Sequence, residues 1–252
     1  MKYKLHYGQY LGDYLQSIDF EIISSPDYYK NLKELLKLKK TNIPLIRLGN
    51  KGDGGYVMLD NFNSKIAYSF GIDNDVTWDL DMAKLGYDVY MYDPTIDMDT
   101  RYTQFHFHKI GIDSYNHDCY KTLHTLLEEN NHKENMILKM DVEGYEWNFL
   151  ETVGEEINLF DQIILEIHNI IVGDEERNLR LLDKLNKTHQ LIHIHGNNAS
   201  LSLTSDYTIT DVIECTYVKR DYALFDYTPT LPIELDYPND PGRPDVILGK
   251  WD

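Results

Sequence analysis

One stretch of thirty residues, Lys65 to Pro94, limits the folds open to this chain most strongly. Its sequence is KIAYSFGIDNDVTWDLDMAKLGYDVYMYDP, and the apolar run from Ile66 to Phe70 predicts a buried strand that stops at Gly71. Asp75 is placed to cap a following helix, and a second strand ends at Asp93. A strand, a glycine turn, a helix and a strand that ends in an acid are typical of the nucleotide-binding half of a doubly wound α/β fold.

The turn in this stretch indicates which nucleotide it can take. A pyrophosphate needs several glycines in an uncharged cradle, as in G-x-G-x-x-G, whereas Gly71 stands alone between strand and helix. Asp73 and Asp75 would repel phosphates, so NAD and FAD fit poorly. S-adenosylmethionine (SAM) has no phosphate and carries a positive sulfonium, and Asp93 is placed to accept hydrogen bonds from its ribose hydroxyls. The alternative is an ordinary βαβ loop without a ligand.

Composition narrows the class of protein further. With 252 residues and 42% hydrophobic side chains, the chain is expected to form a single domain, 1–252, with a sizeable core. Its net charge of −18 disfavours nucleic acid and anionic membranes as partners. Cys119 and Cys215 are too few for a disulfide framework, and no segment approaches the roughly 18 continuous apolar residues of a membrane span. These features predict a soluble cytoplasmic protein.

The rest of the chain continues the alternation of strands and helices. Residues 1–44 are predicted to be a helical extension, 45–225 the catalytic core and 226–252 a proline-rich tail that wraps the surface. The last expected strand is reached through a loop without helical pattern, so it is expected to pair antiparallel. The expected elements are a helix at 26–40, a glycine-rich hairpin at 45–59, strands at 105–112, 136–140, 161–168, 190–195 and 211–218, and helices capped by Asp118, spanning 145–153 and capped by Asp174.

Seven strands, with helices between all but the last two, match the Rossmann-like α/β fold of class I methyltransferases. In that fold a mostly parallel sheet of seven strands has its last strand antiparallel and carries helices on both faces. The motifs that agree are RLGNKGDGGYVM, YSFGIDNDVTWDLDMAKLG, YDPT, LKMDVEGYEWNFL, ILEIH and HIHGNN. Together they resemble the FkbM-related branch of SAM-dependent methyltransferases over Leu45 to about Tyr217. The resemblance implies SAM as the cofactor, and related bacterial proteins include O-methyltransferases that modify sugars of capsules and other glycans.

The cofactor site is expected where the strand order of an open α/β sheet reverses, between the strands at 66–70 and 136–140. The glycine hairpin before the first of these strands is predicted to close over the methionine end of SAM, with Arg47 binding its carboxylate. A plain surface hairpin is the alternative. The motifs and the resemblance together predict thirteen cofactor-binding residues: Arg47, Asp53, Gly54, Gly55, Tyr56, Gly71, Asn74, Asp75, Asp93, Pro94, Ile112, Asp141 and Glu143.

The candidate catalytic residues are His168, Asp141 and His195, which all stand at expected strand ends. A neutral imidazole, with a pKa near 6.5, can accept the proton of a sugar hydroxyl, so His168 is the expected base. The resemblance implies that Asp141 contacts cofactor or acceptor. The alternatives are a helix cap for Asp141, an edge histidine for His168 and a loop turn for His195. A divalent cation held by Asp141, Glu166, His168 and His195 is a further alternative, which is not favoured because these residues come from different strands without local ligand spacing.

The sequence therefore predicts a SAM-dependent O-methyltransferase that acts on a hydroxyl of a sugar. The expected acceptor is a nucleotide-linked sugar used in capsule or surface-glycan biosynthesis, and S-adenosylhomocysteine is the expected product. The alternatives are an N-methyltransferase and a SAM- or sugar-binding module without turnover. A homo-oligomer stays open, and the sequence does not define which hydroxyl is methylated.

Overall fold

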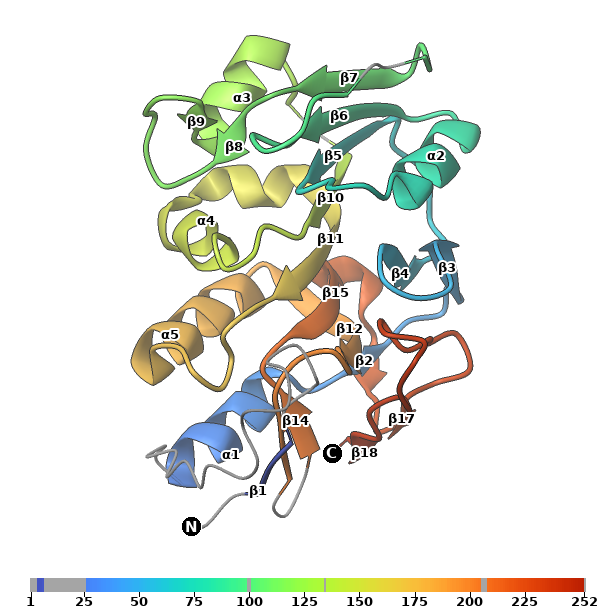
Figure 1. Cartoon of the computed structure of the whole chain (residues 1–252), viewed down its shortest axis with the longest axis vertical. Helices are drawn as coiled ribbons and strands as arrows, with labels where there is room; N and C mark the ends of the chain where they lie inside the picture. Colours follow the sequence, from blue (N-terminus) through green and yellow to red (C-terminus); the bar gives the residue numbers. More distant parts are fainter. Residues whose placement is uncertain (1–3, 7–25, 99–100, 134, 205–207, 252) are drawn as a thin grey trace.

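A computed structural model describes residues 4–6, 26–98, 101–133, 135–204 and 208–251, and a seven-stranded sheet runs through its centre (Figure 1). β15 pairs antiparallel with both of its neighbours, whereas the other neighbouring pairs are parallel. This arrangement confirms the predicted α/β fold with its antiparallel last strand. In spatial order the strands are β12 (His189–Gly196), β15 (Ile213–Lys219), β11 (Phe160–Ile167), β10 (Met136–Met140), β5 (Ile66–Phe70), β6 (Asp88–Tyr92) and β7 (Phe105–His108).

Alternate side chains of the central strands enter two separate cores. Along β10, Leu138 packs into the core under four helices, and Ile137 packs into the core on the opposite face. Because side chains alternate along a strand, a strand covered on both faces reads as a continuous apolar run. One face carries α1 (Pro26–Leu35), α3 (Leu123–Asn130), α4 (Glu146–Thr152) and α5 (Glu175–Asn186), and the other carries α2 (Thr77–Lys84) with the hairpin β3 (Leu45–Gly49) and β4 (Gly55–Leu59).

The order of the strands reverses between β5 and β10, which places Gly71 against Asp141. The backbone N–H of Asp141 donates to the carbonyl of Phe70 over 3.0 Å. Gly71 has a φ of +74°, and a Cβ at this position would lie 1.6 Å from the carbonyl oxygen of Asp141. The close approach of the end of β10 therefore requires a glycine after β5.

Two predicted elements have different bounds. The helix expected at 26–40 ends at Leu35, and the residues after it form the short strand β2 (Lys39–Lys40), which pairs with β16 (Phe225–Asp226). The strand expected at 105–112 is divided, because the chain turns after β7 where the N–H of Ile110 bonds to the carbonyl of His108. Its last part is β8 (Gly111–Ile112), which pairs with β9 (Tyr120–Lys121) and lies outside the central sheet.

The helix caps agree with the sequence in part. Asp174 caps α5 as predicted, with its side chain accepting from the N–H of Arg177. Thr122 caps α3 in place of Asp118, because the backbone of Asp118 is left-handed and lies before β9. Asp75 precedes α2 by two residues and accepts from the N–H of Thr77 over 2.7 Å.

The C-terminal tail is part of the folded core, in contrast to the expected surface wrap. Trp251 is 1% exposed, and its indole N–H donates to the carbonyl of Leu36 over 2.8 Å. β17 (Thr230–Leu231) pairs with β18 (Gly249–Lys250), so the two ends of the tail are joined. The tail therefore packs against the core beside α1.

The remaining elements are short. β1 (Lys4–His6), β13 (Ser202–Thr204) and β14 (Thr208–Thr210) form a small sheet, and single 3₁₀ turns lie at Glu155–Leu159 and Arg220–Tyr222. The rest of the predicted N-terminal extension before Pro26 lies outside the described residues. Both cysteines are free, Cys119 exposed and Cys215 buried. Within the described ranges, every helix is too short or too polar to cross a membrane.

Candidate active site

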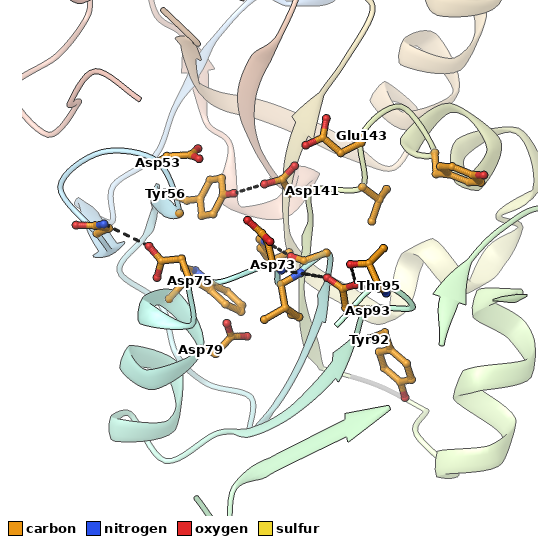
Figure 2. Close-up of a pocket in the computed structure, with 18 of the residues that line it drawn as sticks. Asp53, Tyr56, Asp73, Asp75, Asp79, Tyr92, Asp93, Thr95, Asp141 and Glu143 are labelled. Atoms are coloured by element: carbon orange, nitrogen blue, oxygen red, sulfur yellow. Dashed lines mark hydrogen bonds between the residues drawn. The ribbon is translucent and has the colours of Figure 1, made fainter. Parts of the chain in front are cut away.

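A cavity of about 570 Å³ opens at the carboxyl ends of β5, β6 and β10, which is where the strand order reverses (Figure 2). Its volume falls within the range of roughly 300–1,000 Å³ that is typical of small-molecule sites. The only lysines in its described lining are Lys51 and Lys139, so acids predominate and favour a cationic ligand over a phosphate. The seven lining acids are Asp53, Asp73, Asp75, Asp79, Asp93, Asp141 and Glu143.

Ten of the thirteen predicted cofactor residues line this cavity: Asp53, Gly54, Tyr56, Gly71, Asp75, Asp93, Pro94, Ile112, Asp141 and Glu143. Gly55 and the exposed Asn74 lie beside it without lining it. Arg47 is also outside the lining, because its guanidinium supports the hairpin loop. Its Nε donates to the carbonyl of Asn50 over 2.8 Å, and one terminal nitrogen donates to the carbonyl of Gly52 over 2.7 Å.

The Asp93 carboxylate organises the turn that follows Gly71. Its Oδ2 accepts from the N–H groups of Ile72 (2.8 Å) and Asp73 (3.0 Å). Its Oδ1 accepts from both the N–H (2.8 Å) and the hydroxyl (2.6 Å) of Thr95. Burial alone would raise the pKa of Asp93, but these four bonds hold it below its usual value. Since a carboxylate has about four acceptor positions, the protein's own donors occupy them all.

Tyr56 connects the hairpin to the end of β10. Its hydroxyl donates to Oδ2 of Asp141 over 3.0 Å, and Figure 2 shows the two side chains facing each other. Lys139, two residues before Asp141, donates to the carbonyl of Gly71 and places its ammonium 5.6 Å from the centre of the Tyr56 ring. Lys139 lies in the KMDVEG motif, two residues before Asp141. A lysine in an otherwise apolar strand, close to an acid, is the feature from which its place in the site could have been predicted.

The first turn of α2 contributes two residues that the sequence did not single out. Trp78 and Asp79 are each 2% exposed and line the cavity. Neither Trp78 Nε1 nor Asp79 Oδ1 has a hydrogen-bond partner among the described residues. Burial raises the pKa of Asp79 to about 6 against the opposing charge of Lys139. Two residues of the lining therefore carry buried polar atoms, one donor and one acceptor, that no described residue engages.

The other end of the cavity is apolar. Pro94 and Ile112 lie there with three tyrosines, Tyr92, Tyr120 and Tyr145. The rings of Tyr120 and Tyr145 are stacked, with centroids 5.7 Å apart and planes inclined by 16°. A flat aromatic base suits this wall, whereas the opposite end is formed by the polar hairpin loop.

His168 follows β11 and lies beside the cavity rather than in its lining. Its Nδ1 is 3.2 Å from Glu146, and its Nε2 is 3.3 Å from Glu143. Burial disfavours the imidazolium, but the bond to Glu146 and the charges of Glu146, Asp141 and Glu143 raise the pKa of His168 to about 9. The expected value near 6.5 does not hold, because the carboxylates surround the ring, and the imidazole is protonated at neutral pH.

His195 is buried in β12 and does not reach the cavity. Its Nδ1 is 3.1 Å from Glu214 and its Nε2 is 3.0 Å from Asp245. Burial lowers the pKa of His195, but the two carboxylates raise it to about 10. Both ring nitrogens are engaged, so the structure makes His195 a buried cation in an ion-pair network, not the base that its position at a strand end suggested.

The tail reaches this network and the cavity through Asn239, which sequence reasoning missed. Asn239 is 7% exposed, and its amide nitrogen donates to Glu214 over 2.6 Å and to Asp53 over 3.3 Å. Asp53 and Asn239 are 186 residues apart in sequence. Nothing in a proline-rich tail signals such a contact, because it depends on the folded path of the chain.

The fold and the cavity together define a Rossmann-like α/β protein of the methyltransferase class. A family model described as the methyltransferase FkbM domain matches residues 26–197, which is more than half of the chain. The chain therefore belongs to the FkbM methyltransferase family. The model spans α1 to β12 and includes every predicted catalytic and cofactor residue.

No curated protein matches the chain. A solved structure from Anabaena variabilis ATCC 29413, provisionally named as a methyltransferase from an antibiotic biosynthesis pathway, is similar at 14% identity with a TM-score of 0.30. That match covers 53% of this chain and 60% of the other, so this chain spans less than two thirds of that protein.

Proposed function

We propose that this protein transfers a methyl group from SAM to a hydroxyl of a sugar. The observation that carries the proposal is the acid-lined cavity behind Gly71, at the strand-order reversal of a methyltransferase-family sheet. The residues fit SAM by their chemistry. The tyrosine-rich wall suits adenine, and the carboxylates of the lining suit a ligand with cationic groups.

SAM supplies an electrophilic methyl group on a positively charged sulfur. In this proposal Asp93 holds the turn after Gly71 and contacts the ribose. The Thr95 hydroxyl, which can rotate away, frees one acceptor position on Oδ1 of Asp93 for a ribose hydroxyl. Of the two lysines in the lining, Lys51 at the hairpin loop is proposed to pair with the methionine carboxylate in place of Arg47. Asp141 and Glu143 then face the acceptor, and their oxygens can accept hydrogen bonds from sugar hydroxyls and align one of them.

In this scheme the acceptor hydroxyl needs a base. With a pKa of about 9, His168 must lose a proton before it can accept one, which costs about 3 kcal/mol at pH 7. An amine acceptor needs less help from a base, and the carboxylates of Asp53, Asp141 and Glu143 would attract it. Transfer to nitrogen is therefore the second candidate function.

Mass spectrometry distinguishes these candidates. The protein is incubated with SAM bearing a deuterated methyl group and with nucleotide-linked sugars in matched pairs, one member carrying a hydroxyl where the other carries an amine. A labelled methyl on the hydroxyl member supports the proposal. Labelling confined to the amine member would replace it with N-methyl transfer. We further propose that the reaction serves capsule or surface-glycan synthesis and takes place in the cytoplasm.

A further inference from the structure

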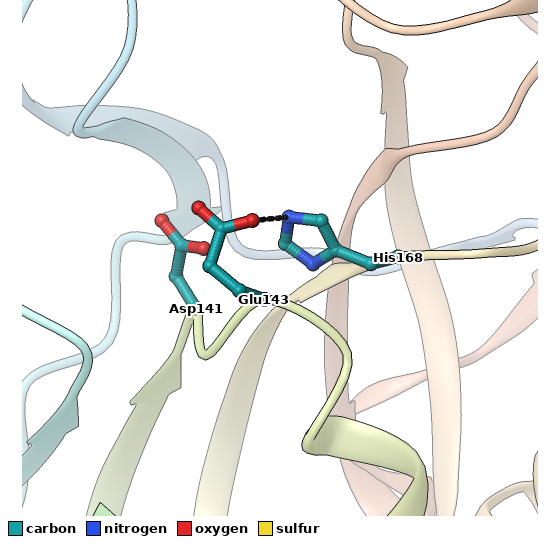
Figure 3. A group of neighbouring side chains, drawn as sticks. All are labelled: Asp141, Glu143 and His168. Carbon is teal, nitrogen blue, oxygen red and sulfur yellow. Dashed lines mark ion pairs between the residues drawn. The ribbon is translucent and has the colours of Figure 1, made fainter.

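Three side chains at the edge of the cavity direct ligand atoms toward one point (Figure 3). One atom each from Asp141, Glu143 and His168 lies within 4.8 Å of the other two. Asp141 directly follows β10, Glu143 lies in the loop to α4, and His168 directly follows β11. The group is therefore assembled from the carboxyl ends of two adjacent strands, at the edge of the cavity.

Glu146 determines which nitrogen of His168 faces this point. The carboxylate of Glu146 is fully buried and accepts from the N–H groups of Val142 (2.8 Å) and Gly144 (2.9 Å). Because both oxygens of Glu146 already accept from backbone N–H groups, the Nδ1 of His168 at 3.2 Å is the donor of their hydrogen bond. Nε2 is then directed at Glu143. An imidazole that donates through one nitrogen to a carboxylate is the usual arrangement of a metal-bound histidine.

Glu166 supplies an independent observation that points to a cation. It is 3% exposed, its Oε1 accepts from Asn197, and its Oε2 has no hydrogen-bond partner in the part of the chain that the structure describes. The residues just before Glu166 and Asp141 are paired across β11 and β10, so these two carboxyl groups are neighbours. A buried carboxylate oxygen that no donor contacts, next to another carboxylate, carries a cost that a nearby cation would reduce.

We propose that Asp141, Glu143 and Nε2 of His168 bind one divalent cation of the oxygen-seeking class, Mg²⁺ or Mn²⁺. Two carboxylates and an imidazole suit such an ion, and three protein ligands leave coordination positions for hydroxyls of a substrate. This ligand set differs from the cation site considered from the sequence, which contained Glu166 and His195 in place of Glu143. His195 is excluded because Glu214 and Asp245 engage both of its nitrogens.

A cation at this point also removes the difficulty with the base. It displaces the Nε2 proton and lowers the pKa of a bound hydroxyl, so a free imidazole is not needed. The hydroxyl oxygen takes the methyl from the sulfonium, which becomes a thioether, and the hydroxyl proton leaves to solvent. This consequence rests on the proposed methyl transfer, whereas the binding of the cation does not.

The test is a titration of the full chain with Mn²⁺ alone, without SAM or acceptor. Binding is measured as the loss of the free-ion signal in electron paramagnetic resonance. We expect saturable one-to-one binding below about 1 mM. Glu143→Gln and His168→Gln should each weaken it at least about tenfold. Glu143 is exposed, so its replacement does not disturb the core. His124 provides the matched control, because it also lies between two glutamates but is 61% exposed and outside the cavity lining.

The proposal stands only if both variants lose this affinity and His124→Ala keeps it. Absence of saturable binding would overturn the proposal, as would wild-type affinity in either variant or an equal loss in His124→Ala. Circular dichroism of each variant verifies that the fold is intact before binding is compared. Because the titration contains no SAM, its failure leaves the methyl-transfer proposal to be judged by SAM binding and product analysis.

Discussion

Replacing His195 by glutamine should destabilise the fold without removing a group from the cavity lining. The imidazolium lies 3.1 Å from Glu214 and 3.0 Å from Asp245 and is 1% exposed. Removing one partner of a buried ion pair typically costs about 3–5 kcal/mol, since the remaining charge stays buried without a partner. Here Glu214 would be left opposite Glu166, its pairing partner across β15 and β11, so two acids would share one buried region.

The pH dependence of this loss is fixed by the pKa of His195, about 10 in the fold and near 6.5 in an unfolded chain. Between these values the folded state binds more protons than the unfolded state, so the stabilisation falls as the pH rises. It is fully present below pH 6.5 and is lost as the pH passes 10. The difference corresponds to on the order of 5 kcal/mol, most of which is present at pH 7.

Urea denaturation of wild type and His195→Gln at pH 7, 8.5 and 10 measures this effect. The difference in unfolding free energy should shrink from several kcal/mol at pH 7 to a small remainder at pH 10. His189 in the same strand is the control: it is buried, it lies 2.8 Å from the carbonyl of Phe160, and burial lowers its pKa to about 4. His189→Gln should therefore show a constant difference over this range. A His195→Gln difference that does not change with pH would refute the assignment of a buried cation.

Three further substitutions test the turn and the hairpin. Asp93→Ala should weaken binding of S-adenosylhomocysteine by roughly 1.5–3 kcal/mol in calorimetry, because it removes a charged acceptor, and unchanged affinity would contradict its role. Gly71→Ala should lower the Tm sharply, because its Cβ would lie 1.6 Å from the Asp141 carbonyl oxygen, and wild-type stability would show that the strand ends are not so constrained. Arg47→Lys should cost about 0.5–1.5 kcal/mol of unfolding free energy in urea for each lost bond to the hairpin loop. A large loss of S-adenosylhomocysteine affinity with unchanged stability would instead restore Arg47 as a ligand of the cofactor.

The parts of the fold that the sequence predicts are those coded locally. The run from Ile66 to Phe70, the glycine after it and the acid at Asp93 are read from neighbouring residues, and each lies where the pattern places it. The carboxyl ends of parallel strands meet at one edge of a sheet. This rule alone predicts that Asp141 lies next to Gly71, without information on any other contact. The cavity lining was predictable to the extent that it is built from such ends.

The sequence is least informative where a distant partner decides what a side chain does. Position alone makes His195 and His168 look alike, but Asp245 of the tail approaches only the first. The Arg47 guanidinium donates to carbonyls of its own hairpin, and the spacing of residues in the sequence does not reveal these bonds. Asn239 enters the site because the tail folds back over the sheet, and Glu143 rather than His195 accompanies His168 because the loop before α4 turns toward β11.

The central claim, that the cavity behind Gly71 binds SAM, is tested most directly by calorimetric titration of S-adenosylhomocysteine, with NAD titrated in parallel. The account predicts saturable one-to-one binding of S-adenosylhomocysteine, a raised Tm by mass action, and no binding of NAD. In Ile112→Trp, an indole in place of the isoleucine side chain in the buried wall of the cavity should abolish the binding, with circular dichroism as the check that the fold persists. Binding of NAD without binding of SAM or S-adenosylhomocysteine would contradict the account.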